Sequence, residues 1–341
     1  MESIHYGSIA VVTSNDNLVA WYGNPQTITF LRSTAKPFQI LPLIENGGRE
    51  KFGLTPKEIA LICASHSGTD EHKAVVESIQ AKTGVLESDL LCGIHQPLHR
   101  VTADEMALRG EKPTPNRHNC SGKHTGMVAY ARLGGHSYQP GENAYINFSH
   151  PIQVEILSVF AQMSGLKSSD VHVGVDGCSA PNFAVPLRNT ALGYARLCDP
   201  TGLTERRRAA CQTITQAMMA NPFMVGGPGS FDTALMEVTQ GRIISKGGAE
   251  GFQGMGVMPG AISPASPAMG IAFKISDGDY RNQARSAIAL EILRQLNLLS
   301  ESELSLLKGF GPSFTLTNFR KIEIGQGLTS FRLKYPINPP G

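Results

Sequence analysis

The sequence predicts an α/β fold of the α+β type, in which one antiparallel sheet built from both chain termini packs against a helical region. Short runs rich in β-branched residues stand near the start of the chain and near residues 241–278. Stretches with helical periodicity and helix-start signals fill most of the chain between them. No repeat or linker-like segment divides the 341 residues, so we expect a single domain covering 1–341.

The strands are predicted from alternation and turn residues. Residues 8–23 indicate two strands joined by a turn at Asn15-Asp16-Asn17. The apolar run 59–63 is expected to be a buried strand, and residues 171–175 a strand that ends in a turn at Asp176-Gly177-Cys178. Towards the C-terminus, 241–260 predicts a hairpin and 268–278 a further strand.

The helices are predicted from apolar periodicity and capping signals. One helix is expected to open near Ser33, because Pro37 is tolerated in a first turn. Others are expected near 70–84, 119–135, 151–163, 203–220, 231–239 and 279–299. Residues 93–118, with three prolines, are expected to be mainly loop.

The bulk composition limits the partners and the compartment. A net charge of +2 favours neither nucleic acid nor a membrane surface as a partner. No apolar run approaches the ~18 residues of a membrane span, and the N-terminus lacks the pattern of a secretory signal. We therefore expect a cytoplasmic protein. In a reducing compartment, four of its six cysteines are expected to be small apolar core residues: Cys63, Cys92, Cys198 and Cys211.

Ser33 and Lys36 stand three residues apart in the stretch LRSTAKPFQ. Residues at this spacing share one face of a helix, so the Lys36 amine is expected to reach the Ser33 hydroxyl. A serine beside an amine base is a known arrangement for an activated nucleophile. The same serine can instead be an ordinary N-cap, since the motif is short.

Lys246 is a second candidate base, which could reach a serine on a neighbouring turn. Ser65 opens the turn Ser65-His66-Ser67-Gly68, and Lys246 lies on the predicted hairpin. Two buried amines lower one another's pKa, and a lysine that is neutral near pH 7 can act as a base for serine. Lys246 can also be a solvated charge at a strand end.

Cys120, Lys123 and Cys178 form a third candidate group. Two thiolates from separate loops can bind a soft or borderline metal, with zinc the default. Cys-x-x-Lys is not a standard metal spacing, so two buried cysteines remain the alternative, and His124 is equally consistent with a structural role. The glycine-rich stretch 225–233 lacks the spacing of a phosphate-binding loop, so no nucleotide site is predicted.

Five stretches, RSTAKPFQ, CASHSGTDEH, NCSGKHTGM, VDGCSAPNFAVPL and KGGAEG, together resemble the rhizobial-type L-asparaginases, often called the asparaginase II family. The resemblance runs from about residue 7 to about residue 324. It implies a fold similar to serine β-lactamases and bacterial glutaminases, a homodimer, and hydrolysis of L-asparagine to L-aspartate and ammonia. A glutaminase or penicillin-recognising hydrolase, and a non-catalytic zinc-binding protein, are the alternatives.

The resemblance also assigns roles to individual residues. It implies two Ser–Lys tandems, Ser33–Lys36 and Ser65–Lys246, and a zinc site of Cys120, Lys123 and Cys178. In this interpretation Ser33 attacks the side-chain amide and Ser65 relays the proton, although the two serines could exchange roles. Asp176 matches a residue that recognises the substrate's α-amino group. The other residues in substrate-binding stretches are Arg32, His124 and Glu250.

Overall fold

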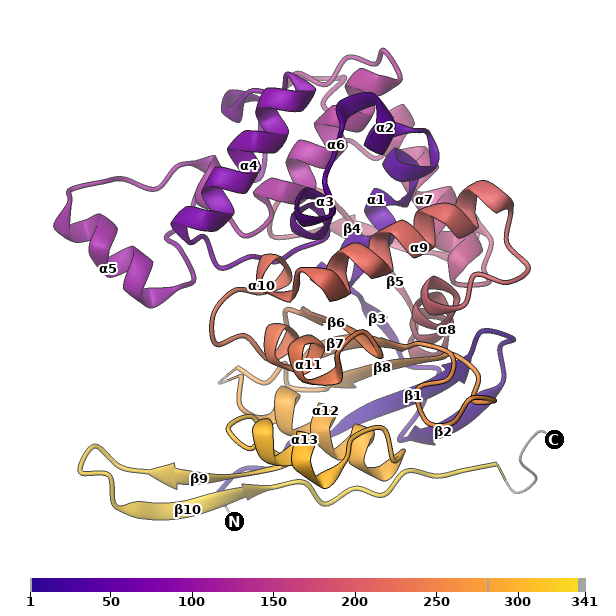
Figure 1. Cartoon of the computed structure of the whole chain (residues 1–341), viewed down its shortest axis with the longest axis vertical. Coiled ribbons are helices and arrows are strands. Elements are labelled where there is room, and N and C mark those ends of the chain that lie inside the picture. The colour runs from indigo at the N-terminus through magenta and orange to yellow at the C-terminus, as the bar shows by residue number, and fades with distance from the viewer. Residues whose placement is uncertain (1, 281, 337–341) are drawn as a thin grey trace.

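The fold is described here from a computed structural model covering residues 2–280 and 282–336. Its central feature is a five-stranded antiparallel sheet in the order β2-β1-β8-β7-β6. The strands are β1 (Gly7–Thr13), β2 (Leu18–Tyr22), β6 (Ile243–Gly248), β7 (Phe252–Val257) and β8 (Met269–Ile275). The N-terminal strand β1 pairs directly with β8 (Figure 1), which confirms a sheet built from both ends of the chain.

Both faces of this sheet are covered by helices. Alternate residues of β1 point to opposite sides: Ala10 and Val12 join one apolar cluster, and Ile9 and Val11 join another. Helix α8 (Leu187–Cys198) packs on the first face, and α11 (Phe231–Thr239) and α12 (Ala284–Gln295) pack on the second. A Cβ at Gly270 would lie 1.7 Å from the Ala191 carbonyl oxygen, so glycine is required where α8 crosses β8.

A helical region lies beside the first face of the sheet, as Figure 1 shows. Its centre is α1 (Lys36–Glu45), which is buried on all sides up to Ile44 and packs against α6, α7 and α9. The helices of this region are α1, α2 (Gly48–Phe52), α3 (Pro56–Ile62), α4 (Asp70–Thr83), α5 (Arg100–Leu108), α6 (Ser121–Leu133), α7 (Pro151–Met163), α9 (Glu205–Ala220) and α10 (Pro222–Val225).

The remaining elements are small. A three-stranded antiparallel sheet has the order β3-β5-β4, and a hairpin of β9 and β10 extends from the body beside α13. Their bounds are β3 (Ile28–Phe30), β4 (His172–Val175), β5 (Pro181–Pro186), α13 (Glu301–Leu306), β9 (Ser313–Thr317) and β10 (Glu323–Leu328). In the part of the chain that the structure covers, no helix is both long and apolar enough to cross a bilayer.

One of the expected elements is wrong. Residues 59–63 belong to helix α3 and its end, because Thr55 and Glu58 form a capping box and Pro56 occupies the first turn. An apolar run this short does not distinguish a buried strand from a buried helix, and the capping signal decides. The stretch 93–118 contains helix α5, and β5, α8 and the β9–β10 hairpin were not predicted. The other predicted helices and strands are present, with shifted ends.

Candidate active site

Lys36 is the first residue of α1, and its side chain is only 1% exposed. Its Nζ donates hydrogen bonds to Ser65 Oγ at 2.8 Å, to the Ala64 carbonyl oxygen at 2.6 Å and to the Asn119 carbonyl oxygen at 3.2 Å. Three acceptors match the three N–H bonds of an ammonium group. The surroundings of Lys36 therefore stabilise the charged amine beside Ser65.

Lys246 approaches the same hydroxyl from the sheet. Ile244, two residues before it on β6, faces the helical region, and strand alternation puts the Lys246 side chain on that face as well. Lys246 Nζ lies 2.9 Å from Ser65 Oγ and 2.7 Å from the Gly247 carbonyl oxygen. Ser65 itself is half-buried, so its hydroxyl has an amine on two sides while the residue keeps some access to solvent.

The expected hydrogen bond between Ser33 and Lys36 is not formed. Ser33 lies in a 3₁₀ turn, Arg32–Ala35, that leads directly into the α-helix at Lys36, so the two residues still share one face and their spacing alone does not prevent the contact. The half-buried Ser33 hydroxyl makes no hydrogen bond among the described residues, and Lys36 extends instead to Ser65. The helix prediction located the lysine but not the hydroxyl with which it pairs.

The electrostatics of the two amines differ. Burial lowers the pKa of Lys246 to about 7, with Lys36 and Arg285 adding to the shift and the Asp232 carboxylate opposing it. Near pH 7 a large fraction of Lys246 is therefore neutral. A neutral amine has a free lone pair, which can accept the Ser65 proton.

Arg32, Asp176 and Glu250 form a polar cluster. Arg32 Nε donates to Asp176 Oδ1 at 2.7 Å, and Arg32 Nη1 lies 3.8 Å from Glu250 Oε1. Arg32 and Glu250 both have left-handed backbone angles, with φ of 53° and 60°. Non-glycine residues adopt this conformation where the surroundings hold them in it, and such residues are concentrated at binding sites.

Cys120, Lys123 and Cys178 lie together, and all three are buried. Lys123 Nζ donates to Cys178 Sγ at 3.0 Å. The Cys120 thiol and then the Lys123 ammonium lower the pKa of Cys178, while the pKa of Cys120 is raised because it donates to Cys178. Burial alone would lower the pKa of Lys123, but the charge on Cys178 outweighs burial and raises it. The cluster thus holds a thiolate beside an ammonium.

His124 adds an unpartnered nitrogen to this cluster. Its Nδ1 contacts the Tyr145 hydroxyl at 2.6 Å, whereas its buried Nε2 has no hydrogen-bond partner among the described residues. Burial lowers the pKa of His124 to about 4, although the nearby Cys178 opposes the shift, so the imidazole is neutral. The structure therefore places His124 with the thiols and not beside Arg32.

This set of donors fits zinc by its chemistry. Zinc prefers thiolate and neutral nitrogen ligands, so the two thiols and a deprotonated Lys123 amine are suitable donors. The orphaned His124 nitrogen lies near Cys178 but does not complete a ligand set with the two thiols. Within residues 2–280 and 282–336, no three side chains of His, Cys, Asp or Glu are placed to hold a metal together. Any site here must therefore use the Lys123 amine, which has to lose its proton in order to bind.

Comparison with known proteins decides the family. A family model described as L-asparaginase II matches residues 1–327. The chain belongs to the L-asparaginase II family. Membership in this family indicates an amidohydrolase of the asparaginase type. No sequence among the curated proteins matches this family member significantly.

Solved structures show only a distant likeness to this L-asparaginase II family member. A structure of Mglu is 13% identical with a TM-score of 0.44, and the match covers 87% of this chain and 63% of that one. A Bacillus subtilis glutaminase, YbgJ, in covalent complex with 5-oxo-L-norleucine is 12% identical with a TM-score of 0.39, covering 86% and 89%. This chain therefore matches less than two thirds of the length of Mglu.

Some groups at the site were not found from the sequence. The Asn119 carbonyl contacts Lys36, and Tyr145 contacts His124. Asp232 contacts Ser245 and Gly247, the residues on either side of Lys246. Tyr145 and Asp232 belong to no recognisable pattern. Asp232 lies in the glycine-rich stretch that had been considered only for phosphate binding. The four cysteines expected in the core, Cys63, Cys92, Cys198 and Cys211, are all buried free thiols.

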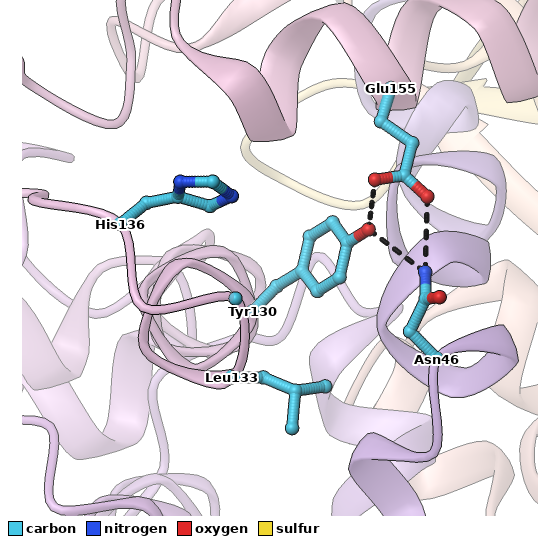
Figure 2. A pocket seen from close by; sticks show the side chains of 6 residues that line it. Asn46, Tyr130, Leu133, His136 and Glu155 are labelled. Atoms are coloured by element: carbon cyan, nitrogen blue, oxygen red, sulfur yellow. Dashed lines mark hydrogen bonds between the residues drawn. The ribbon is translucent and has the colours of Figure 1, made fainter.

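An open pocket of about 390 Å³ lies elsewhere, at the far end of α1. Figure 2 shows the Tyr130 hydroxyl between Glu155 and Asn46, with His136 on the other side of the ring. Asn46 follows the last residue of α1 and Lys36 is the first, so the pocket is roughly 15 Å from the paired amines. Its carboxylate is already hydrogen-bonded, and no lysine, cysteine or serine lines it.

Proposed function

We propose that this protein hydrolyses L-asparagine through an aspartyl-enzyme ester on Ser65, with Lys246 as the base and Lys36 as a fixed positive charge. The observation that carries the proposal is the position of Ser65 Oγ, 2.8 Å from Lys36 Nζ and 2.9 Å from Lys246 Nζ. A serine hydroxyl becomes a strong nucleophile when an adjacent base takes its proton.

The first half of the reaction forms the ester. Neutral Lys246 accepts the Ser65 proton while Oγ attacks the side-chain amide carbon of asparagine. Lys36, held as an ammonium by its three acceptors, stabilises the developing negative charge on Oγ. Lys246 then returns the proton to the departing nitrogen, the C–N bond breaks, and ammonia leaves.

The second half of the reaction hydrolyses the ester. Lys246, again neutral, takes a proton from water as the water oxygen attacks the ester carbon. The ester C–O bond breaks, and Ser65 regains its proton from Lys246. Aspartate is released. Because Lys246 acts in its neutral form in both halves, activity is expected to rise with pH through about 7.

Substrate orientation is assigned to the polar cluster. Asp176 is proposed to bind the α-amino group, since its carboxylate is held in place by Arg32 and by the Gly177 N–H. The Arg32 guanidinium, which has Asp176 on one side and Glu250 on the other, can offer its remaining N–H groups to the α-carboxylate. His124 was expected to bind substrate directly, but we now propose that it supports the thiol cluster.

Zinc is proposed to bind Cys120, Lys123 and Cys178. When bound, the metal supplies a fixed positive charge that neutralises the thiolates and organises this part of the pocket. Cys178 Sγ lies 3.7 Å from Asp176 Oδ2, so one of the proposed metal ligands contacts the carboxylate proposed to orient the substrate. We also propose a homodimer and a single domain, in line with the family resemblance.

The decisive experiment measures ammonia release from L-asparagine and L-glutamine by wild type, Ser65→Ala and Ser33→Ala. We expect Ser65→Ala to lose activity by about 10³-fold or more, and Ser33→Ala to lose much less. Trapping the ester by mass spectrometry after acid quenching would place it on a peptide containing Ser65. An ester on Ser33, or full activity of Ser65→Ala, would refute the assignment.

A further inference from the structure

A buried carboxylate lies behind the strand that carries Lys246. Asp232, the second residue of α11, is 7% exposed and packs on the face of the sheet opposite the site. Its carboxylate accepts hydrogen bonds from Ser245 Oγ at 2.7 Å, from the Gly247 N–H at 2.7 Å and from Gln253 Nε2 at 2.9 Å. Two of these three donors are the residues on either side of Lys246.

We propose that Asp232 is a positioning residue: it holds Lys246 Nζ against Ser65 from the far side of β6 and, through its charge, sets how readily that amine takes up a proton. The inference rests on the proposed function, in which Lys246 is the base.

The geometric part follows from the strand. β6 is an edge strand of the sheet, so it has a neighbouring strand on one side alone, and its backbone is less firmly fixed than that of an inner strand. Asp232 gives the Gly247 N–H a partner, and the Gly247 carbonyl in turn accepts from Lys246 Nζ at 2.7 Å. Gly247 thus links the carboxylate on one face to the amine on the other.

The electrostatic part follows from the groups around Lys246. The charged and titratable groups close enough to influence it are Lys36 from α1, Cys63 after α3 and Cys120 before α6, together with Arg285 from α12 and Asp232 from α11, the two helices on the opposite face of the sheet. Burial raises the pKa of Asp232, but Lys246, Arg285 and the donated hydrogen bonds outweigh burial and hold it below its ordinary value. Asp232 is therefore ionised at neutral pH and favours the protonated form of Lys246. Without it, Lys246 would be a weaker base.

The Asp232→Asn substitution removes the negative charge of the side chain while keeping its size and shape. The buried Gln253 Oε1 has no hydrogen-bond partner among the described residues, so the Gln253 amide can turn and accept from the new Asn NH₂. The shape of the site and most of its hydrogen bonds are therefore retained. The matched control is Glu291→Gln, which neutralises a buried carboxylate of α12 whose partners are Arg294 and Gln295.

The first measurement is the pH dependence of kcat/KM for L-asparagine. We expect the acidic limb to lie near pH 7 in wild type and in Glu291→Gln. In Asp232→Asn it is expected to move down by about one pH unit, with a plateau about tenfold lower because the base is weaker. A purely structural role for Asp232 would lower the melting temperature and the plateau but leave the limb in place, and that result would overturn the proposal.

The second measurement does not depend on activity. In protein labelled with ¹³C-lysine, the Lys246 Cε resonance, identified by its loss in Lys246→Arg, should titrate near pH 7 and at lower pH in Asp232→Asn. If Asp232→Asn does not fold, Asp232→Glu keeps the charge but displaces it by one methylene. It should retain the wild-type limb and lose kcat, and an unchanged kcat would overturn the positioning role.

The outcomes separate this inference from the proposed function. Full activity of Lys246→Met would overturn the proposed function, and the inference with it. The inference alone would be overturned by a different pair of results. Lys246→Met would be inactive, but Asp232→Asn would leave both the acidic limb of the pH profile and the Lys246 Cε titration unchanged.

Discussion

Two buried clusters in this protein each combine lysine with nucleophilic side chains, and they titrate in opposite directions. In the first, Lys36 and Lys246 surround the Ser65 hydroxyl. In the second, Lys123 lies beside the thiols of Cys120 and Cys178. Each lysine is 1% exposed, yet burial lowers the pKa of Lys246, whereas the pKa of Lys123 is raised because the charge on Cys178 outweighs burial.

The difference shows that burial alone does not decide the protonation of a lysine. A serine hydroxyl is not ionised near neutral pH and offers no charge to hold a second ammonium, so one of two neighbouring amines loses its proton. A thiol ionises much more easily, so a single lysine and a thiolate stabilise each other. In the proposed mechanism the first arrangement supplies the base for acyl transfer. The second holds a thiolate that can bind a cation once Lys123 has lost its proton.

The largest expected effect is on catalytic activity, when the lysine of one cluster or the other is replaced. Lys36→Met removes the positive charge from Ser65 and is expected to lower kcat/KM for L-asparagine by about 10³-fold. Lys123→Met leaves Ser65 and both of its amines in place, so its loss should be at least tenfold smaller. Steady-state kinetics together with melting temperatures would test this. A Lys123→Met protein as inactive as Lys36→Met, and equally stable, would contradict the division of roles.

The next effect is on stability. Lys246 has a pKa of about 7 when folded and near 10.5 when unfolded, so between these pH values the unfolded chain binds more protons. The free energy of unfolding therefore rises with pH in this window, by up to roughly 4 kcal/mol between pH 7 and pH 10 from this one group. The destabilisation is fully present below pH 7.

The Lys246→Met variant lacks the titrating amine, so comparing it with wild type measures this contribution. Relative to wild type, its free energy of unfolding from urea titration should be most favourable at pH 6–7 and should lose that advantage towards pH 10. Lys57→Met, at an exposed lysine paired with Glu71, is the control and should show no such trend. A difference between Lys246→Met and wild type that does not vary with pH would mean that Lys246 keeps its ordinary pKa.

The same contrast explains what the sequence could and could not reveal. The motif with Ser33 and Lys36 identified a buried lysine of the candidate site, but the partner hydroxyl comes from Ser65, 29 residues after Lys36, in the turn that follows α3. Local spacing puts Ser33 and Lys36 on one face of the turn, but the position of the Lys36 amine is decided by acceptors from distant segments. The wrong strand at 59–63 did not affect the location of Ser65, because either element ends just before it.

Asp232 is a residue whose role could not be predicted from the sequence at all. Its partners lie on β6 and β7, and the contact depends on α11 packing across the edge of the sheet. A single aspartate after a glycine-rich stretch has no pattern that predicts a hydrogen bond to the residues around Lys246. The sheet built from both chain termini, by contrast, followed from the order of the predicted strands and helices, because strand-forming runs and turn residues are local properties of the sequence.

The third prediction concerns the metal. Cys178→Ser removes the thiolate, and we expect its zinc affinity to fall by at least about 100-fold. Cys198→Ser, at a buried thiol far along the chain in α8, should bind zinc as wild type does. Competition with a chromogenic chelator measures the affinity, and the Lys246 titration should be unchanged in Cys178→Ser. Equal zinc affinity in the two variants would remove the metal from this cluster.

The smallest expected effect lies at the residues between the two clusters. Arg32→Lys keeps the positive charge but loses the planar fork that can hold Asp176 and a substrate carboxylate together, so KM for L-asparagine should rise by about 3- to 10-fold with kcat nearly unchanged. Arg188→Lys makes the same exchange at a partly exposed pair with Asp16 and should leave both constants unchanged. If Arg32→Lys lowers kcat instead of raising KM, then Arg32 acts on the reacting groups and not on the α-carboxylate. Asparagine would in that case be oriented mainly by Asp176, whose carboxylate lies between Arg32 and the Cys178 thiol.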